Sequence, residues 1–277
     1  MNVQDRDDSR AGWDRIAPGY DRTNTPTQMW LGNEALRRAG LGPGMRFLDV
    51  AAGSGALAIP AARRGARVLA TDRSAAMLGL LQQRARTEGL VIETREMDGH
   101  ALALDNGSFD MAGSQFGVML FPDMPRGIRE MARVVKSGGR VLVVAYGDPH
   151  EIEFLGFLVT AIQGVRPSFD GPPIDPPPLP FQLQSPDRLR DELAAARLGE
   201  ISVETITEVT EFDSGSALWD WLVCSNPIVD ALLTDLALDE DERGKIRRAL
   251  DTMILDRAGG AIAAKLSNPV HVGIGTK

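Results

Sequence analysis

The sequence predicts an α/β protein built on a doubly wound, mainly parallel β-sheet. Three observations support this prediction. Five short apolar segments between residues 46 and 145 alternate with segments of helical periodicity, as in right-handed βαβ crossovers. The first of them, Arg46–Val50, breaks into small residues and glycines just before a helical pattern begins. Acidic residues lie at the ends of the first three segments, on the edge where such sheets bind ligands.

The strand candidates follow one another at short intervals. They are Arg46–Val50, Arg67–Thr71, Val91–Arg95, Phe109–Ser114 and Arg140–Ala145. Helices are expected near 55–64, from the N-cap residue Ser74 onward, and near 123–136, where Ser137-Gly138-Gly139 ends the helix. Residues 1–44 are expected to form helices that lead into the first strand.

The regular alternation stops after Gly147. An apolar helix is expected over 151–165, and the eight prolines of 166–186 favour extended backbone. Ser185-Pro186 is a typical helix start, with Gly199 as its expected end. Strands are expected over Ile201–Phe212 and Pro269–Thr276, with a helical segment over 214–264 between them.

Composition narrows the class of protein. Of the 277 residues, 43% are hydrophobic and 25% are charged, as in globular proteins, and no apolar run is long enough for a membrane span. The net charge of −8 and the lack of a Lys/Arg block argue against a nucleic-acid partner and favour a small-molecule substrate. The polar N-terminus does not resemble a secretory signal, so a cytoplasmic location is expected. The one cysteine, Cys224, is expected to be a buried apolar residue, and no metal site is expected.

Polar and glycine residues at the strand ends predict a nucleotide-type site. Asp49 precedes Gly53-Ser54-Gly55, where glycine lets the backbone approach a ligand and a helix start offers free N–H groups. Asp72 follows the second strand, where a carboxylate can accept both hydroxyls of a ribose. Asp98-Gly99 follows the third strand and can accept an adenine amino group, and Gln115-Phe116 ends the fourth, facing the same crevice.

These segments together resemble the class I S-adenosylmethionine-dependent methyltransferases. The similar group includes the ubiquinone/menaquinone-biosynthesis and small natural-product methyltransferases. The residues that carry the resemblance are WDRIAPGYD (13–21), LDVAAGSG (48–55), ATDRSAAML (70–78), MDGHALALDNGSFD (97–110) and RVVKSGGRVLVVAYGD (133–148). The resemblance is good over about residues 13–150 and weak beyond them.

The resemblance implies a seven-stranded sheet with an antiparallel last strand. It also implies S-adenosylmethionine as cofactor and S-adenosylhomocysteine as product. By position, Gly53, Gly55 and Asp49 lie near the methionine part of the cofactor and Asp72 holds the ribose. Arg73 and Met77 flank the adenine, Asp98 and Gly99 bind its edge, Gln115 and Phe116 lie beside the methyl group, and Tyr20 belongs to a helix that closes over the site. Ala51 stands where the family usually has a glycine, which reaches positive φ more freely.

Other functions remain open from the residues themselves. GSGALA (53–58) also fits a G-x-G-x-x-A dinucleotide pattern, so a nicotinamide-dependent oxidoreductase is an alternative, as is a non-catalytic cofactor-binding protein. No Ser/His/Asp cluster is visible, and in-line methyl displacement needs alignment and exclusion of water more than a fixed base. His150, after the fifth strand, is a candidate base because histidine titrates near neutral pH.

Four regions follow from this interpretation. Residues 1–44 are N-terminal helices over the cofactor site, and 45–147 are the cofactor-binding core. Residues 148–200 are a proline-rich and helical lid, and 201–277 hold the last two strands with a helical insertion at 213–264. The lid and the insertion are expected to hold a small, apolar or aromatic acceptor. The oligomeric state is left open between monomer and homodimer.

Four side chains carry separate expectations. His100 is expected to be exposed and His271 to be structural. Trp219 and Trp221 are two residues apart, so one is expected in the core and the other at a pocket or interface.

Overall fold

In a computed structural model, which describes residues 3–171, 177–225 and 227–277, one mixed sheet organises the chain. Its strands follow the order β3-β2-β1-β4-β5-β7-β6. They are β1 (Arg46–Val50), β2 (Arg67–Asp72), β3 (Ile92–Glu96), β4 (Phe109–Gln115), β5 (Val135–Tyr146), β6 (Gly199–Phe212) and β7 (Ala264–Thr276). Strands β1 to β5 pair in parallel, and β7 runs antiparallel to both β5 and β6. The doubly wound sheet with an antiparallel last strand is therefore confirmed.

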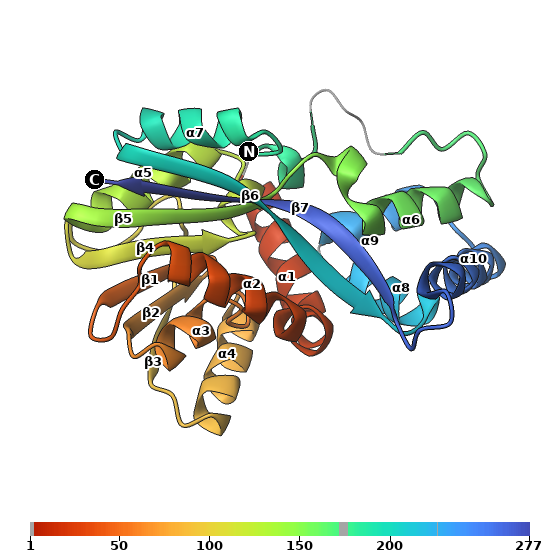
Figure 1. The fold of residues 1–277 in the computed structure, drawn as a ribbon, viewed down its shortest axis with the longest axis horizontal. Helices are drawn as coiled ribbons and strands as arrows, with labels where there is room; N and C mark the ends of the chain where they lie inside the picture. Colours follow the sequence, from red (N-terminus) through yellow and green to blue (C-terminus); the bar gives the residue numbers. More distant parts are fainter. Residues whose placement is uncertain (1–2, 172–176, 226) are drawn as a thin grey trace.

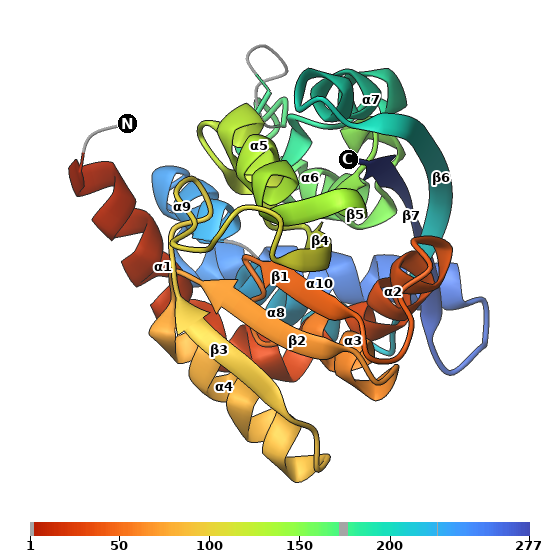
Figure 2. The ribbon, with the colours of Figure 1, turned by 90° about the vertical axis from the view of Figure 1, so that its left-hand side faces the viewer.

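Helices cover both faces of the sheet (Figures 1 and 2). Helices α2 (Thr25–Arg38), α3 (Ala58–Arg63) and α4 (Ala75–Thr87) lie on one face, and α5 (Met124–Val134) and α7 (Pro186–Ala195) lie on the other. Helix α1 (Val3–Thr23) packs against α2, α4 and α8. Because the crossovers cover both faces, β1 and β4 are buried along almost their whole length, polar residues such as Asp49 included.

The second half of the chain builds a smaller helical layer beside the sheet. Figure 1 shows α6 (Glu153–Gln163), α8 (Gly215–Ser225), α9 (Pro227–Asp235) and α10 (Glu240–Ala258) gathered around the far ends of β6 and β7. These helices and strand ends share an apolar cluster of their own, separate from the cluster under the main sheet. Tyr146, at the end of β5, packs against both clusters.

Several element boundaries differ from the expected ones. Helix α3 begins at Ala58 because 53–57 form the glycine-rich turn, and α6 is shorter than expected because a 3₁₀ turn precedes it. Strand β5 begins at Val135, and the glycines at 138 and 139 fall at an irregularity in its pairing with β4. Strand β6 begins at Gly199, which was expected to be only a helix end. The segment 214–264 forms α8, α9 and α10, and β7 begins at Ala264 because Ala264–Asn268 pair with the long edge strand β6.

The proline-rich segment holds little regular structure. Among its described residues, a 3₁₀ turn at Leu179–Phe181 precedes α7, which Ser185 caps by accepting a hydrogen bond from the Arg188 N–H. Residues 172–176, on which part of the lid prediction falls, lie outside the described residues.

The expectation for the two tryptophans of α8, one in the core and one at a pocket, is confirmed, because Trp221 also lines a cavity and Trp219 does not. Trp219 and Trp221 are each 3% exposed. Helices α1 and α10 both pack against α8. Side chains on more than one side of α8 are therefore buried, unlike those of a surface helix with a single apolar face. Cys224, at the end of α8, is half-buried rather than fully buried.

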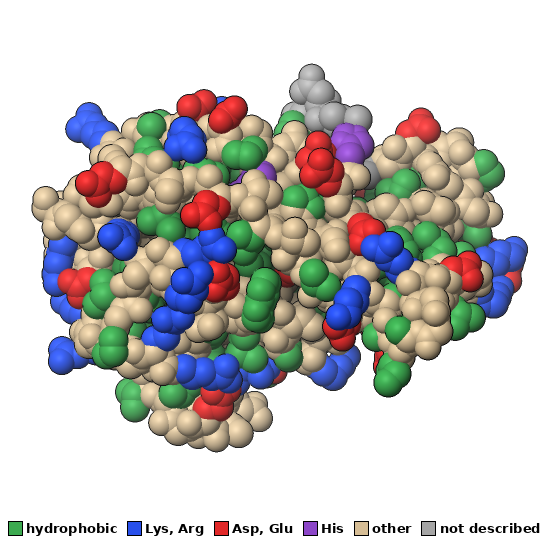
Figure 3. Space-filling model, viewed as in Figure 1, with side chains coloured by type: hydrophobic (Ala, Val, Ile, Leu, Met, Phe, Trp, Pro, Cys, Tyr) green, Lys and Arg blue, Asp and Glu red, His purple; other side chains and the backbone are tan. Residues whose placement is uncertain are grey.

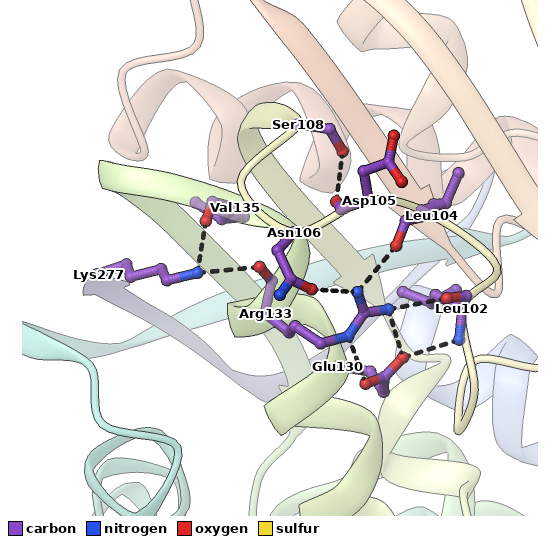
Figure 4. Close-up of polar contacts among 9 residues, drawn as sticks. All are labelled: Leu102, Leu104, Asp105, Asn106, Ser108, Glu130, Arg133, Val135 and Lys277. Carbon is purple, nitrogen blue, oxygen red and sulfur yellow. Dashed lines mark hydrogen bonds and ion pairs between the residues drawn. The ribbon is translucent and has the colours of Figure 1, made fainter.

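Helix α5 fixes the loop that follows β3. Figure 4 shows the Arg133 guanidinium donating hydrogen bonds to the backbone carbonyls of Leu102 and Leu104 and to the side chains of Asn106 and Glu130. Glu130 in turn accepts the Leu102 N–H at 2.8 Å. Charged partners strengthen such bonds, so the loop that carries Asp98 is anchored at its far end.

Charges are mixed over the surface. Figure 3 shows Lys and Arg side chains interspersed with Asp and Glu side chains on the visible face. Among the described residues, no helix has the length and apolar character needed to cross a bilayer.

Replacing Gly215 by alanine is expected to destabilise the helical layer strongly. A Cβ at this position would lie 2.0 Å from the Asp251 backbone nitrogen, so α8 and α10 would have to separate. Overpacking of this kind costs about 3 kcal/mol or more, which thermal unfolding would report as a melting temperature lower by about 6 °C or more. Gly79→Ala is the matched control, because a Cβ there meets nothing within 4 Å. Equal melting temperatures for the two variants would contradict the packing argument.

Candidate functional site

The turn after β1 is a concave stretch of backbone. Ala51, Gly53 and Gly55 all have positive φ, at 56°, 53° and 106°. Alanine thus takes up the conformation for which the family resemblance led us to expect glycine, at a modest steric cost. Gly117 lies against it, because a Cβ on Gly117 would come within 2.6 Å of the Ala51 Cβ. Glycine at 117 therefore leaves the room that Ala51 needs.

Asp72 ties the end of β2 to this turn. Its carboxylate accepts the Gly53 N–H at 2.8 Å and the Ser74 N–H at 2.9 Å. Burial raises the pKa of Asp72, and these backbone donors only partly oppose the shift. Each carboxylate oxygen has a second lone pair, so two hydroxyl groups of a ligand can still be accepted.

Asp49 is buried and its charge is uncompensated. The side chain is 1% exposed, and neither carboxylate oxygen has a hydrogen-bond partner among the described residues. Burial, and then the nearby Asp72 charge, hold the pKa of Asp49 well above its usual range, while the Ala58 N–H opposes this without forming a well-aligned hydrogen bond. An unpartnered buried acid is costly, and a cationic group of a ligand would relieve that cost.

His100 orients Asp98, which corrects the expectation that His100 is exposed. The imidazole is buried against the Phe121 ring, with centroids 4.6 Å apart. Its Nδ1 lies 2.7 Å from Asp98 Oδ1, which also accepts the His100 backbone N–H at 2.9 Å. Burial acts to raise the pKa of Asp98, but these contacts outweigh it and the pKa is lowered.

Helix α1 is fastened over the strand ends by polar contacts. The Ser74 hydroxyl donates to Asp14 at 2.5 Å, and Arg84 pairs with Asp21 at 2.6 Å. Ser74 also caps α4, as expected, by accepting the Met77 N–H. The Thr25 and Ser54 hydroxyls, 2.5 Å apart, join the start of α2 to the glycine-rich turn.

These elements enclose a cavity of about 430 Å³ at the carboxyl ends of β1, β2 and β4. Its described lining includes every predicted cofactor residue except Gly55: Tyr20, Asp49, Ala51, Gly53, Asp72, Arg73, Met77, Asp98, Gly99, Gln115 and Phe116. Gly55 serves packing instead, since a Cβ there would lie 3.0 Å from Ile59 and Leu81. The size and position fit a nucleotide-type cofactor at the switch point of the sheet.

A second cavity, of about 370 Å³, adjoins the first. Trp13, Tyr20, Phe116 and Leu120 line both. Farther in, the Phe116 and Tyr146 rings stack at 4.2 Å, Phe154 meets the Tyr146 ring edge-on at 5.7 Å, and Trp221 meets Phe154 at 5.0 Å. We call Phe116, Tyr146, Phe154 and Trp221 the aromatic wall.

Tyr20 and two glutamines form a polar network where the cavities meet. The Tyr20 hydroxyl donates to Gln28 Oε1 at 3.0 Å, and Gln115 Nε2 donates to the Gln28 carbonyl at 3.1 Å. Tyr146 lines the same cavity as Gln28. Loss of hydration, followed by nearby acids, raises the pKa of both tyrosines. Both phenols therefore stay neutral at physiological pH.

The remaining histidines lie away from this junction. His150 lines the second cavity, but its side chain is 69% exposed and its Nδ1 lies 2.8 Å from Asp148. His271 is buried between Thr205 and the Gln184 carbonyl, at 2.9 Å from each, in keeping with a structural role. Among the residues described, no group of three or more His, Cys, Asp or Glu side chains is placed to hold a metal.

Sequence reasoning missed several lining residues. Trp13, His100 and Phe121 line the first cavity, and Gln28 and Tyr146 line the second. Trp13 and Tyr146 lie within segments that carry the family resemblance. Trp13 is about two helical turns before the predicted Tyr20, and Tyr146 is at the end of β5. Gln28 had no such signal, because its place depends on how α2 packs on the sheet.

Comparisons with known proteins agree with this geometry. A family model described as a methyltransferase domain matches residues 48–143. An uncharacterized protein of Mycobacterium tuberculosis strain H37Rv is 34% identical over 196 residues, which make up 69% of this chain and 67% of that protein. A demethylmenaquinone methyltransferase of Clavibacter sepedonicus is 34% identical over 145 residues, or 50% of this chain and 58% of that protein. The YcgJ protein of Bacillus subtilis superposes with a TM-score of 0.56 at 17% identity, over 90% of this chain and 97% of that one.

The sheet order and the adjoining cavities define an α/β fold with a cavity at the carboxyl ends of its parallel strands, the edge where such folds bind ligands. The chain belongs to the class I S-adenosylmethionine-dependent methyltransferases and is distantly homologous to demethylmenaquinone methyltransferases. Membership of this family sets aside the nicotinamide-dependent oxidoreductase and the non-catalytic binding protein.

Proposed function

We propose that this methyltransferase acts on a small molecule with an apolar or aromatic body. The acceptor would occupy the cavity beside the aromatic wall, with the cofactor in the cavity at the strand ends. The observation that carries the proposal is that the two cavities meet at Trp13, Tyr20, Phe116 and Leu120. A donor and an acceptor bound on either side of this junction would be held close and in line.

The cofactor-binding roles expected from the family are part of this proposal. The unpartnered Asp49 carboxylate and the turn at Ala51 and Gly53 suit the charged methionine part. The lone pairs left on Asp72 suit the ribose hydroxyls. Asp98 and Gly99 would bind the adenine edge, between Arg73 and Met77.

The bound cofactor supplies the reactive sulfonium methyl group. The chain aligns the acceptor and excludes water, for which the aromatic wall and α1 are suited. The neutral Tyr20 and Tyr146 hydroxyls would orient the acceptor by hydrogen bonds near Phe116. A base role for His150 stays a prediction, and its exposure places it toward the outer end of the cavity.

Partner and location predictions stand beside this proposal untested. They are a cytoplasmic location, no nucleic-acid partner, no required metal, and a monomer or homodimer. The regional division into a core, a lid at 148–200 and an insertion at 213–264 likewise stays a proposal.

Titration calorimetry with S-adenosylhomocysteine and with NADH tests the cofactor part directly. We expect binding of S-adenosylhomocysteine and none of NADH. The acceptor part is tested by incubation with S-adenosylmethionine and a panel of phenols, quinols, acids and amines. A mass gain of about 14 daltons, one CH₂ group, marks an acceptor. Turnover confined to highly charged hydrophilic molecules would contradict the apolar-acceptor proposal.

A further inference from the structure

A buried acid near the acceptor cavity has no place in the roles given so far. Glu208 is 2% exposed, in the interior of β6. Its described hydrogen bond comes from Asn268 Nδ2 at the long distance of 3.5 Å, and Asn268 Oδ1 has no partner among the described residues. Buried carboxylates are seldom retained with so little compensation unless a partner completes them.

The strand register places Glu208 on the same sheet face as the aromatic wall. Tyr146 is opposite Val270, and Glu208 is opposite Asn268, two residues along β7. Residues directly opposite each other in neighbouring strands, and residues two apart in one strand, point to the same face of a sheet. The Tyr146 and Glu208 side chains therefore project to the same side of the sheet, the side that carries α2 and α8. Farther along β6 on this face, Phe212 meets Trp221 with ring centroids 5.8 Å apart. On this face of the sheet, Glu208 therefore lies between Val270, which is opposite Tyr146, and Phe212, which contacts Trp221.

Glu208 lines neither cavity itself, but it lies close enough for its charge to affect two tyrosines at their junction. After loss of hydration, ionised Glu208 is the largest cause that raises the pKa of Tyr146, and it also raises the pKa of Tyr20. Burial raises the pKa of Glu208 itself to about 7. A cation in the adjoining cavity would favour the ionised form of Glu208.

The described residues that line the acceptor cavity include several aromatic rings, which can stabilise a cation, and few groups that can stabilise an anion. Its described residues include no Lys or Arg, and its imidazole, His150, is exposed and paired with Asp148. The faces of aromatic rings attract cations. A phenol acceptor would have to ionise where the Tyr20 and Tyr146 phenols are themselves held neutral.

We propose that the acceptor of this enzyme reacts through a neutral secondary or tertiary amine nitrogen on an apolar body, and that Glu208 selects for the positive charge that this nitrogen gains. This inference rests on the proposed function. In the reaction, the nitrogen lone pair forms the N–CH₃ bond while the S–CH₃ bond breaks and its electron pair stays on sulfur. A tertiary amine becomes a quaternary ammonium and no proton is released. A secondary amine becomes a protonated tertiary amine that later loses its proton to water.

Glu208 in this proposal determines specificity and does not touch the reacting atoms. Positive charge moves from the sulfonium toward the acceptor cavity as the methyl group transfers. A negative group beside that cavity lowers the energy of the later, ammonium-like stage more than that of the start. The same group would oppose the formation of a phenolate.

A pair of product analogues with nearly the same shape tests the inference by binding alone. Benzyltrimethylammonium carries a cationic nitrogen where neopentylbenzene carries a neutral carbon. Calorimetry is done at pH 8 with the enzyme saturated by S-adenosylhomocysteine. We expect the cation to bind about tenfold more tightly than the neutral molecule, and Glu208→Gln to remove most of that preference.

Glu204→Gln is the matched control. Glu204 lies on the same strand and face but is exposed and paired with Arg38, so its loss should leave the preference unchanged. Melting temperatures of both variants show whether they are folded. Equal or tighter binding of neopentylbenzene, no binding of the cation at 1 mM (about the weak limit of specific binding), or a folded Glu208→Gln variant with the full preference would overturn the inference. In each of those outcomes, intact binding of S-adenosylhomocysteine would leave the proposed function standing; its loss in the native enzyme would remove both.

Discussion

Replacing Asp72 by alanine is expected to weaken the binding of S-adenosylhomocysteine by about 10- to 100-fold, because hydrogen bonds to a charged group contribute about 1.5–3 kcal/mol. Two effects act together. The ribose hydroxyls lose their acceptor, and the Gly53 and Ser74 N–H groups lose the carboxylate that fixes the glycine-rich turn. Calorimetry on the purified variant measures the change in dissociation constant.

Asp110→Ala is the control for Asp72→Ala. Asp110 also accepts a backbone N–H, from Arg46 at 2.7 Å, and also lies at a strand end. It belongs to the opposite, amino-terminal edge of the sheet, away from the strand ends that line the first cavity. Its loss should leave the dissociation constant unchanged. An Asp72→Ala enzyme with native affinity would refute the ribose role.

The strand ends of the first half could be predicted because their signals are local. Asp49, Asp72 and Asp98 each lie within a few residues of the strand that positions them, and parallel strands bring their carboxyl ends to one edge. The match between these residues and the first cavity follows from that rule. Gly55 differs because the close approach of Leu81, which leaves no room for a Cβ at this position, comes from the packing of α4 and is recorded in no short motif.

What could not be predicted depends on contacts between distant segments. His100 is buried because Phe121 lies over it, and Gln28 reaches Tyr20 only once α2 packs on the sheet. The start of β7 at Ala264 depends on the length of β6, its partner. Glu208 gave no signal because an acid in an alternating edge strand resembles a solvent-facing residue until α8 packs against that strand.

We expect the buried Asp49 carboxylate to lower the stability of the ligand-free enzyme. Its folded-state pKa is raised, mainly by burial, above the value of about 3.9 in an unfolded chain. The folded state therefore holds the proton more tightly, and stability falls as pH rises from about 4 up to the folded-state pKa. Near neutral pH and above, the unpartnered acid makes the ligand-free protein less stable than the same fold with a neutral side chain there.

Asp49→Asn is therefore expected to melt several degrees higher than the native enzyme at pH 8 without ligand, since about 1 kcal/mol corresponds to about 2–4 °C for a chain of this size. The gap should shrink at pH 5, where the native carboxyl is closer to fully protonated. Added S-adenosylhomocysteine, whose ammonium group would pair with Asp49, should raise the melting temperature of the native enzyme much more than that of the variant. Thermal unfolding at both pH values, with and without ligand, measures all three differences. A variant that melts lower than the native enzyme at pH 8 without ligand would show that Asp49 stabilises the fold. A variant whose melting temperature rises as much with the ligand as that of the native enzyme would show that Asp49 does not hold the cofactor.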